Sequence, residues 1–183
     1  MIKLTDLLKS ILPENRMPNR YIEESKQVIK EISLNPSNAF DVTYEEDGGY
    51  FYSSDTKYIF GMSVLPDEFI LPGDKTHTLF IGGMIDIGFS PEGNTILNEP
   101  VGGRENLVKI YSTMYKIILD IASKHKPAYL SISCTKSSGY FPIYSNLTKS
   151  NNIPGYHRKM VVSWNHPELG DMQSIVLTKN TNI

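Results

Sequence analysis

Apolar side chains recur every three or four residues in several stretches of this 183-residue chain. The most regular stretch is KIYSTMYKIILDI, which predicts a long amphipathic helix over residues 104–124. The same spacing predicts two short N-terminal helices over 4–11 and 20–33, each ended by a nearby proline, and a later helix over 138–150. Helical segments are therefore expected before and after a region with a different pattern.

That central region alternates apolar and polar residues, which is the period of a β-strand. We expect a first strand over 40–46, a turn at Asp47-Gly48-Gly49, a returning strand over 50–53 and a third strand over 57–65. Short strands joined by tight turns predict an antiparallel meander.

A long fourth strand is predicted over residues 76–89, with Gly82-Gly83 in its interior. Paired glycines inside a strand indicate a bulge, a bend, or a place where a ligand or another backbone comes close. Alternation divides its side chains into an apolar face with Leu79, Ile81, Ile85, Ile87 and Phe89 and a second face with Phe80, Met84 and Asp86. Asp86 is the only carboxylate in this strand, and its face is compatible with a cleft and equally with solvent.

The nearly continuous apolar run PAYLSISC, residues 127–134, predicts a buried strand with both faces covered. Its place after a strand and a long helix implies a parallel, right-handed crossover to the strand over 76–89. Two last strands, over 158–164 and 173–178, are expected to form a hairpin. These elements predict a mixed α+β fold.

Composition narrows the classes of partner. The formal net charge is −2, so the chain lacks the basic excess of a protein whose main partner is nucleic acid or an anionic membrane. The sequence shows no membrane-spanning apolar stretch and no secretory pattern, and its single cysteine, Cys134, cannot form an internal disulfide. We therefore expect a cytoplasmic protein whose candidate partner is a protein, with no membrane partner and with nucleic acid disfavoured.

Several kinds of site are also disfavoured. The four histidines have no metal-ligand spacing, so no metal site is expected, and Cys134 fits a packed strand better than a nucleophile. Hydrolase, Walker and dinucleotide motifs are absent from the sequence. Tyr156 and Trp164 beside the basic run 157–159 could stack on bases, although such a run is usual at the edge of a sheet.

Acidic residues are concentrated between positions 41 and 75, where eight carboxylates accompany two lysines. A solvated, loop-rich acidic face accounts for them. A site for a basic ligand of the polyamine type is the alternative.

Two segments resemble the GNAT acyltransferase superfamily. KIYSTMYKIILDIASKHKPAYLSISC looks like its long helix and buried strand, and PIYSNLTKSNNIPGYHRKMVVSW looks like its tyrosine-bearing helix and the glycine-aromatic entry into the next strand. The same residues resemble small uncharacterised GNAT-like proteins of bacteriophages. The resemblance covers roughly residues 76–178, and the order of elements in the rest of the chain also matches.

The resemblance implies a mixed, mostly antiparallel, twisted sheet with helices on both faces. It implies a single GNAT-like domain over residues 1–183, made of N-terminal helices in 1–36, the meander in 39–90 and a helix–strand–helix–hairpin unit in 104–178. An acyl-CoA cofactor, with acetyl-CoA as the candidate, is implied as well.

The pyrophosphate of that cofactor would lie on the backbone around Val101, Gly102, Gly103 and Arg104, at the start of the long helix. The order of the glycines and the arginine departs from the family pattern Gln/Arg-x-x-Gly-x-Gly/Ala. Glu105 also adds a carboxylate that repels phosphate. A turn followed by a helix cap is therefore the alternative to an anion site.

Two catalytic residues are implied by the resemblance. Tyr144 matches the tyrosine that protonates the departing thiolate, although it could instead form a packed aromatic pair with Tyr140. Asp86 matches a carboxylate base on the long strand, a role that requires burial to raise its pKa. A gap between the strands over 76–89 and 127–134, near residues 82–86, would be needed to admit the pantetheine arm.

Two functional hypotheses follow. The first is a GNAT-fold protein without catalysis, such as a bacteriophage accessory protein that binds a protein partner. The second is an acyl-CoA-dependent N-acyltransferase that acts on an amine of a protein or a small molecule. The departure from the pyrophosphate pattern favours the first.

Overall fold

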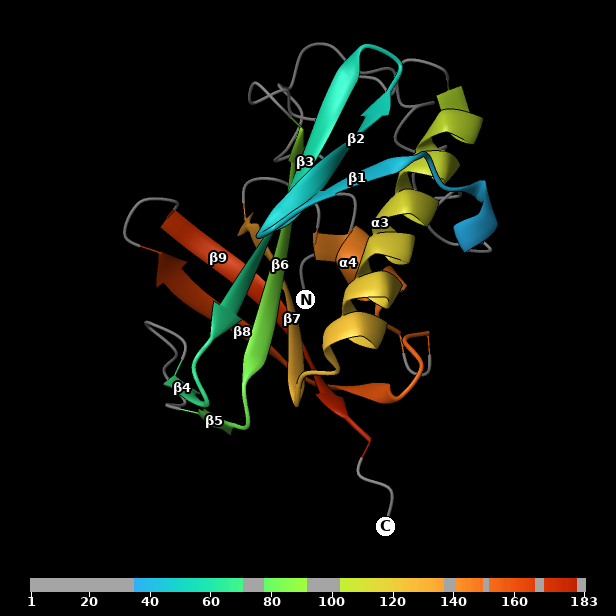
Figure 1. Ribbon diagram of the computed structural model, residues 1–183. Helices are drawn as coiled ribbons and strands as arrows, with labels where there is room; N and C mark the ends of the chain where they lie inside the picture. Colours follow the sequence, from blue (N-terminus) through green and yellow to red (C-terminus); the bar gives the residue numbers. More distant parts are fainter. Residues whose placement is uncertain are drawn as a thin grey trace.

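A computed structural model describes residues 35–70, 78–91, 103–136, 141–149, 152–166 and 170–180. Its main feature is a seven-stranded sheet with the order β1-β2-β3-β6-β7-β9-β8 (Figure 1). The elements are η1 (Pro36–Asn38), β1 (Val42–Glu45), β2 (Gly48–Ser53), β3 (Thr56–Leu65), β4 (Glu68–Ile70), β5 (Leu79–Ile81), β6 (Met84–Pro91), α3 (Gly103–His125), β7 (Tyr129–Thr135), α4 (Phe141–Leu147), β8 (Tyr156–His166) and β9 (Gly170–Lys179). The two predicted N-terminal helices lie outside the described residues.

The predicted antiparallel meander is formed by β1, β2 and β3. Its first turn is Glu46-Asp47, whereas Gly48 and Gly49 belong to β2, which corrects the expected position of the turn. Both glycines are required by the close approach of neighbouring backbone. A Cβ on Gly49 would lie 2.1 Å from the carbonyl oxygen of Thr43, and one on Gly48 would lie 2.2 Å from that of Phe60.

The single long strand expected over 76–89 is wrong, because the chain forms two strands in different sheets. β5 pairs with β4 in a separate two-stranded sheet, and β6 pairs with β3 and β7 in the main sheet. Gly82 and Gly83 separate them with φ angles of 104° and 81°, a conformation that residues with a Cβ rarely adopt. The backbone N–H of Gly82 donates to the carbonyl oxygen of Asp67 at 2.8 Å, which fixes this break beside β4.

The predicted faces of that segment hold only after the two glycines. Ile85 and Ile87 are buried in the main core, as expected. Leu79 and Ile81 are exposed, whereas Phe80 is buried in a second, smaller cluster. The change of direction at the glycines therefore reverses which side chains of β5 are covered.

The crossover through α3 is confirmed, since β6 and β7 are parallel neighbours. α3 spans the predicted range, and its side chains Ile110, Met114 and Ile117 are fully buried against the sheet. Burial of side chains of this size stabilises the fold by about 1.5–3 kcal/mol each. β7 is buried over Leu130–Cys134, on both of its faces, as its apolar run predicts.

The C-terminal hairpin is also confirmed, with longer strands than expected. β9 pairs with both β8 and β7, so it lies inside the sheet and β8 forms the edge. α4 ends at Leu147, earlier than the end predicted for the helix over 138–150, and residues 138–140 of that prediction lie outside the described residues.

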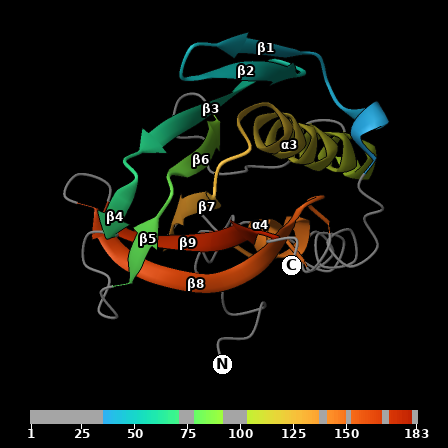
Figure 2. The same cartoon turned by 60° about the horizontal axis from the view of Figure 1, so that its bottom comes forward.

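Two apolar clusters divide the side chains of the sheet. The main core lies between the sheet and both described helices, with Ile132 and Ile175 from the strands, Ile117 from α3 and Tyr144 from α4. Figure 2 shows the strongly twisted sheet curving around α3 and α4. The predicted mixed α+β class with a mostly antiparallel sheet is confirmed, and α3 and α4 share one face of that sheet.

The second cluster lies on the opposite face, where Phe80 packs with Met84, Val162 and Val176. Phe69 of β4 packs against it, so the β4–β5 hairpin covers this part of the main sheet. In the ranges that the structure describes, no helix is both long enough and apolar enough to cross a membrane.

Candidate functional site

The parallel strands β6 and β7 are paired from Met84–Tyr129 to Gly88–Ser133. A gap near residues 82–86, which a pantetheine arm would need, is therefore not formed. Beyond Gly88 the strands separate, because β6 continues along β3 to Pro91 while β7 continues along β9. The position at which a cofactor arm could enter thus lies after residue 88.

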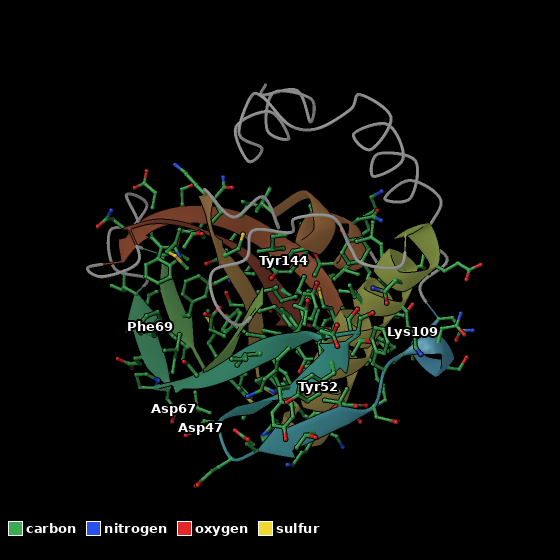
Figure 3. All side chains as sticks on the ribbon, turned by 90° about the horizontal axis from the view of Figure 1, so that it is seen from above. Asp47, Tyr52, Asp67, Phe69, Lys109 and Tyr144 are labelled. Carbon is green, nitrogen blue, oxygen red and sulfur yellow. The ribbon has the colours of Figure 1, made fainter. Side chains whose placement is uncertain are left out.

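Phe89 and Tyr144 pack together at this end of β6. Their ring centroids are 5.8 Å apart, Phe89 is 7% exposed and Tyr144 is completely buried. Figure 3 shows Tyr144 among the side chains of the interior. Its expected partner Tyr140 lies outside the described residues, so the sequence-predicted aromatic contact is replaced by one with Phe89. The Tyr144 ring is thus part of the main core.

Asp86 is the end of a chain of hydrogen bonds that crosses four neighbouring strands. Ser133 Oγ donates to Asp86 Oδ1 at 2.6 Å, and Ser133 Oγ lies 2.6 Å from Ser174 Oγ. Trp164 Nε1 donates to Ser174 Oγ at 2.7 Å. Because an indole N–H can only donate, the chain has one direction when Asp86 is ionised: Trp164 to Ser174, Ser174 to Ser133, and Ser133 to the carboxylate.

Burial raises the pKa of the Asp86 carboxyl, which is the condition for its predicted role as a base. Its side chain keeps part of its surface accessible, yet it lies deep enough for desolvation to raise the pKa of the carboxyl above its ordinary value. The hydrogen bonds from Ser133 and Ser131 oppose that rise, because they stabilise the ionised form. Burial is the larger of the two effects.

The structure does not bring Asp86 and Tyr144 together. Asp86 lies between Ile85 and Ile87, whose side chains enter the main core beside Tyr144. Successive side chains of a strand point to opposite faces, so the Asp86 carboxyl lies on the other face of the sheet. One reacting centre in contact with both side chains is not formed.

The start of α3 is held against β2 by a side-chain pair. Asn106 Nδ2 donates to Ser53 Oγ at 2.7 Å, and Ser53 Oγ donates back to Asn106 Oδ1 at 3.0 Å. Gly103 and Arg104 are the first two residues of the helix, and Glu105 is exposed in its first turn. Val101 and Gly102 lie outside the described residues, so the structure places only Gly103 and Arg104 of the predicted anion site.

Other sequence-predicted candidates have structural positions. Tyr156 is buried, and its hydroxyl donates to the carbonyl oxygen of Pro127 at 2.7 Å, which removes it from a surface for stacking bases. Cys134 is buried in β7, as predicted. Among the described side chains, no three His, Cys, Asp or Glu residues gather in a way that could hold a metal ion.

Sequence reasoning missed the partners of Asp86. Ser133 and Ser174 are separated by 41 positions, and their contact depends on the insertion of β9 beside β7. A signal existed in SISC, where two serines interrupt a buried strand at the spacing that places both on one face. Buried hydroxyls require partners, so that spacing could have pointed to a polar network.

Comparisons with protein-family models, with curated proteins and with solved structures found no match for this chain.

Proposed function

We propose that this chain is a GNAT-like domain that binds a protein partner and does not transfer acyl groups. The order of its strands supports the first part of the proposal. An antiparallel meander leads to one central parallel pair, which a long helix connects, and an antiparallel hairpin follows. This is the order of elements that the sequence resemblance implies.

The pairing of β6 with β7 is the observation that carries the second part. The two strands stay in register through Gly88 and Ser133, and the core on the helical side beyond them contains Phe89 packed on Tyr144. An extended pantetheine arm between the strands would have to displace these buried rings. Truncating or displacing a buried aromatic side chain costs about 3–5 kcal/mol, which weakens binding by at least a hundredfold.

The start of α3 also disfavours a bound pyrophosphate. Glu105 places a carboxylate in the first turn, where it interacts favourably with the helix dipole and repels an incoming anion. This effect adds to the departure of residues 101–104 from the family pattern.

The β4–β5 hairpin supports binding to a protein. Ile70 and Leu79 are direct register partners, and Ile81 lies on the same face. Their side chains are 44%, 47% and 61% exposed. Three large apolar side chains gathered on one small hairpin form a surface that a protein partner would cover.

Thermal unfolding with and without millimolar acetyl-CoA tests the absence of acyl-CoA binding. A ligand at 100 times its dissociation constant adds about 2.7 kcal/mol, which is several degrees for a chain of this size. We expect no shift beyond that produced by the same concentration of ADP. A larger shift with acetyl-CoA that Gly103→Glu abolishes would refute the proposal.

An N-acyltransferase is the second candidate, and the environment of Asp86 favours it. A carboxyl whose pKa is raised by burial and that accepts hydrogen bonds from neighbouring hydroxyls has the properties of a general base. If the acetyl-CoA shift appears, acetylation of an amine acceptor that Asp86→Asn abolishes and Tyr144→Phe retains would support this alternative, in which Asp86 acts without Tyr144.

A further inference from the structure

We infer that the cavity between the β1–β2 turn, β3 and the last turn of α3 binds a lysine side chain of the partner protein. The inference rests on the proposed function and deepens it by naming the chemistry of the partner. The cavity has a volume of about 410 Å³, and its lining residues Phe60 and Met62 on β3 are register partners of Phe89 and Ile87 on β6, one strand from the β6–β7 separation discussed above. Figure 2 shows this end of α3 under β1 and β2 and beside β3.

The cavity exists because β3 extends past the end of the helix. On the side of β3 that faces α3, Phe60 is buried, Met62 is partly exposed and Val64 is 70% exposed. Phe60 and Met62 line the cavity, and the Tyr44 ring stands edge-on to Phe60 with 5.7 Å between the centroids. Such an apolar floor suits the four methylene groups of a lysine side chain, which commonly pack on apolar surface while the charged end meets polar groups.

The charges around the cavity favour a cation. Glu45, Glu46 and Asp120 contribute carboxylates, and Lys124 contributes the only lysine among the lining residues. Glu45 and Glu46 are exposed, and neither forms an ion pair within the described part of the chain. The end of α3 adds the partial negative charge of its last carbonyl groups.

Asp120 shows how an ammonium would be held. Its Oδ2 accepts hydrogen bonds from the Tyr44 hydroxyl and, at 2.8 Å, from Lys116 Nζ. Oδ1 has no partner among the residues that the structure describes. Burial, and then the bond to Asp120, raise the pKa of the Tyr44 hydroxyl, so that it remains a donor and keeps the carboxylate in place.

Lys116 of this chain already shows an ammonium group bound to Asp120. It is not among the lining residues, yet its ammonium pairs with Asp120 and lies 5.6 Å from the centroid of the Tyr44 ring. A second lysine that enters from the cavity would find the other carboxylate oxygen of Asp120. Lys124 at the wall would repel the further charges of a polyamine, whereas a lysine side chain carries one charge at its tip.

NMR titration of the full chain at low salt tests this site. The probes are N-acetyl-lysine amide, its uncharged analogue N-acetyl-norleucine amide, and spermidine. We expect saturable shifts of the Gly48, Met62 and Ser123 amide signals with the lysine probe, and much weaker binding of the norleucine probe. Glu45→Gln/Glu46→Gln should weaken the lysine probe about tenfold, because each exposed ion pair contributes a few-fold. Glu68→Gln, an exposed change on β4 outside the cavity, should leave its affinity unchanged.

Three results would overturn the site. They are equal binding of the lysine and norleucine probes, affinity for the lysine probe that survives the double glutamine change, and saturable binding of spermidine alone. The last result would assign the cavity to polyamines. These results leave the proposed lack of acyl transfer untouched, because acetyl-CoA binding is measured separately, and an acetyl-CoA shift would in turn refute that proposal without affecting the lysine titration.

Discussion

Removal of the Ser133 hydroxyl is expected to destabilise the protein by an amount that grows with pH. Ser133→Ala deletes the donor to Asp86 and the acceptor of Ser174, both at 2.6 Å in a buried strand. A lost hydrogen bond between neutral groups costs about 1 kcal/mol, and one to a charged group costs about 1.5–3 kcal/mol. We therefore expect a loss of about 1 kcal/mol where Asp86 is protonated and about 2–3 kcal/mol where it is ionised.

The direction of this dependence follows from the pKa of Asp86. Burial raises the folded-state pKa above the ordinary value of 3.8. The stability that Asp86 contributes is therefore complete below the unfolded pKa and is lost as the pH rises through the folded pKa. Without the Ser133 donor the folded pKa rises further. Both proteins begin to lose this stability at the shared unfolded pKa, but the loss ends at the folded pKa of each protein and therefore continues to higher pH in the variant. The difference between them widens as the pH rises from the wild-type folded pKa to that of the variant.

Urea unfolding of both proteins at several pH values measures the difference. Ser112→Ala is the matched control, since Ser112 Oγ is also fully buried but has no hydrogen-bond partner among the described residues. That change should alter the free energy of unfolding by less than about 0.5 kcal/mol at every pH. A cost of Ser133→Ala that is constant with pH, or larger in acid, would refute the assigned direction of the hydrogen-bond chain.

Two further substitutions test the packing of the sheet and of α4. Gly49→Ala should destabilise by about 2–4 kcal/mol in urea unfolding, because its Cβ would meet the Thr43 carbonyl oxygen at 2.1 Å, whereas Gly61→Ala on β3, with open space around it, should change stability by less than about 1 kcal/mol. Equal effects of the two glycine substitutions would contradict the close approach. Arg158→Lys should lower the melting temperature by about 2–4 °C. Arg158 Nη2 donates to the Ser145 carbonyl oxygen at 2.5 Å, and a lysine keeps the charge without the guanidinium geometry. An unchanged melting temperature would show that this bond does not hold α4.

Local patterns predicted the elements that depend on neighbouring residues. The apolar spacing of Ile110, Met114 and Ile117 identified α3 within a residue or two at each end, because burial of one helical face is encoded within the segment itself. The buried strand β7 was found for a similar reason, since its continuous apolar run requires cover on both faces.

The features that sequence reasoning missed depend on distant residues. Gly82-Gly83 indicated a bulge or a bend, but alternation is present on both sides of the pair, so the pattern does not show that β5 and β6 belong to different sheets. The division follows from Gly82, whose N–H bonds with Asp67 beside β4. The network of Asp86 likewise needs strand neighbours that only the sheet order defines.

The candidate site was predicted in part. Asp86 was placed correctly on the face opposite the apolar row, but its hydroxyl partners come from β7 and β9. Tyr144 was identified as either an acid or a packed side chain, and its contact with Phe89 places it in the core. The residue types of Asp86 and Tyr144 indicated a base and an acid, and the packing of each side chain decides whether it can act as one.

The position of β9 has a consequence for synthesis of the protein. β9 follows every other described strand in the chain, yet it lies between β7 and β8 and supplies Ile175 and Leu177 to the main core. Until residues 170–179 have left the ribosome, β7 has an unpaired edge and β8 has no neighbour. Unpaired edges and exposed apolar side chains are what chaperones recognise and what promotes aggregation. Completion of this fold is therefore a late event, after translation of nearly the whole described chain, and a ribosome stalled before β9 would hold a chain that cannot close its sheet.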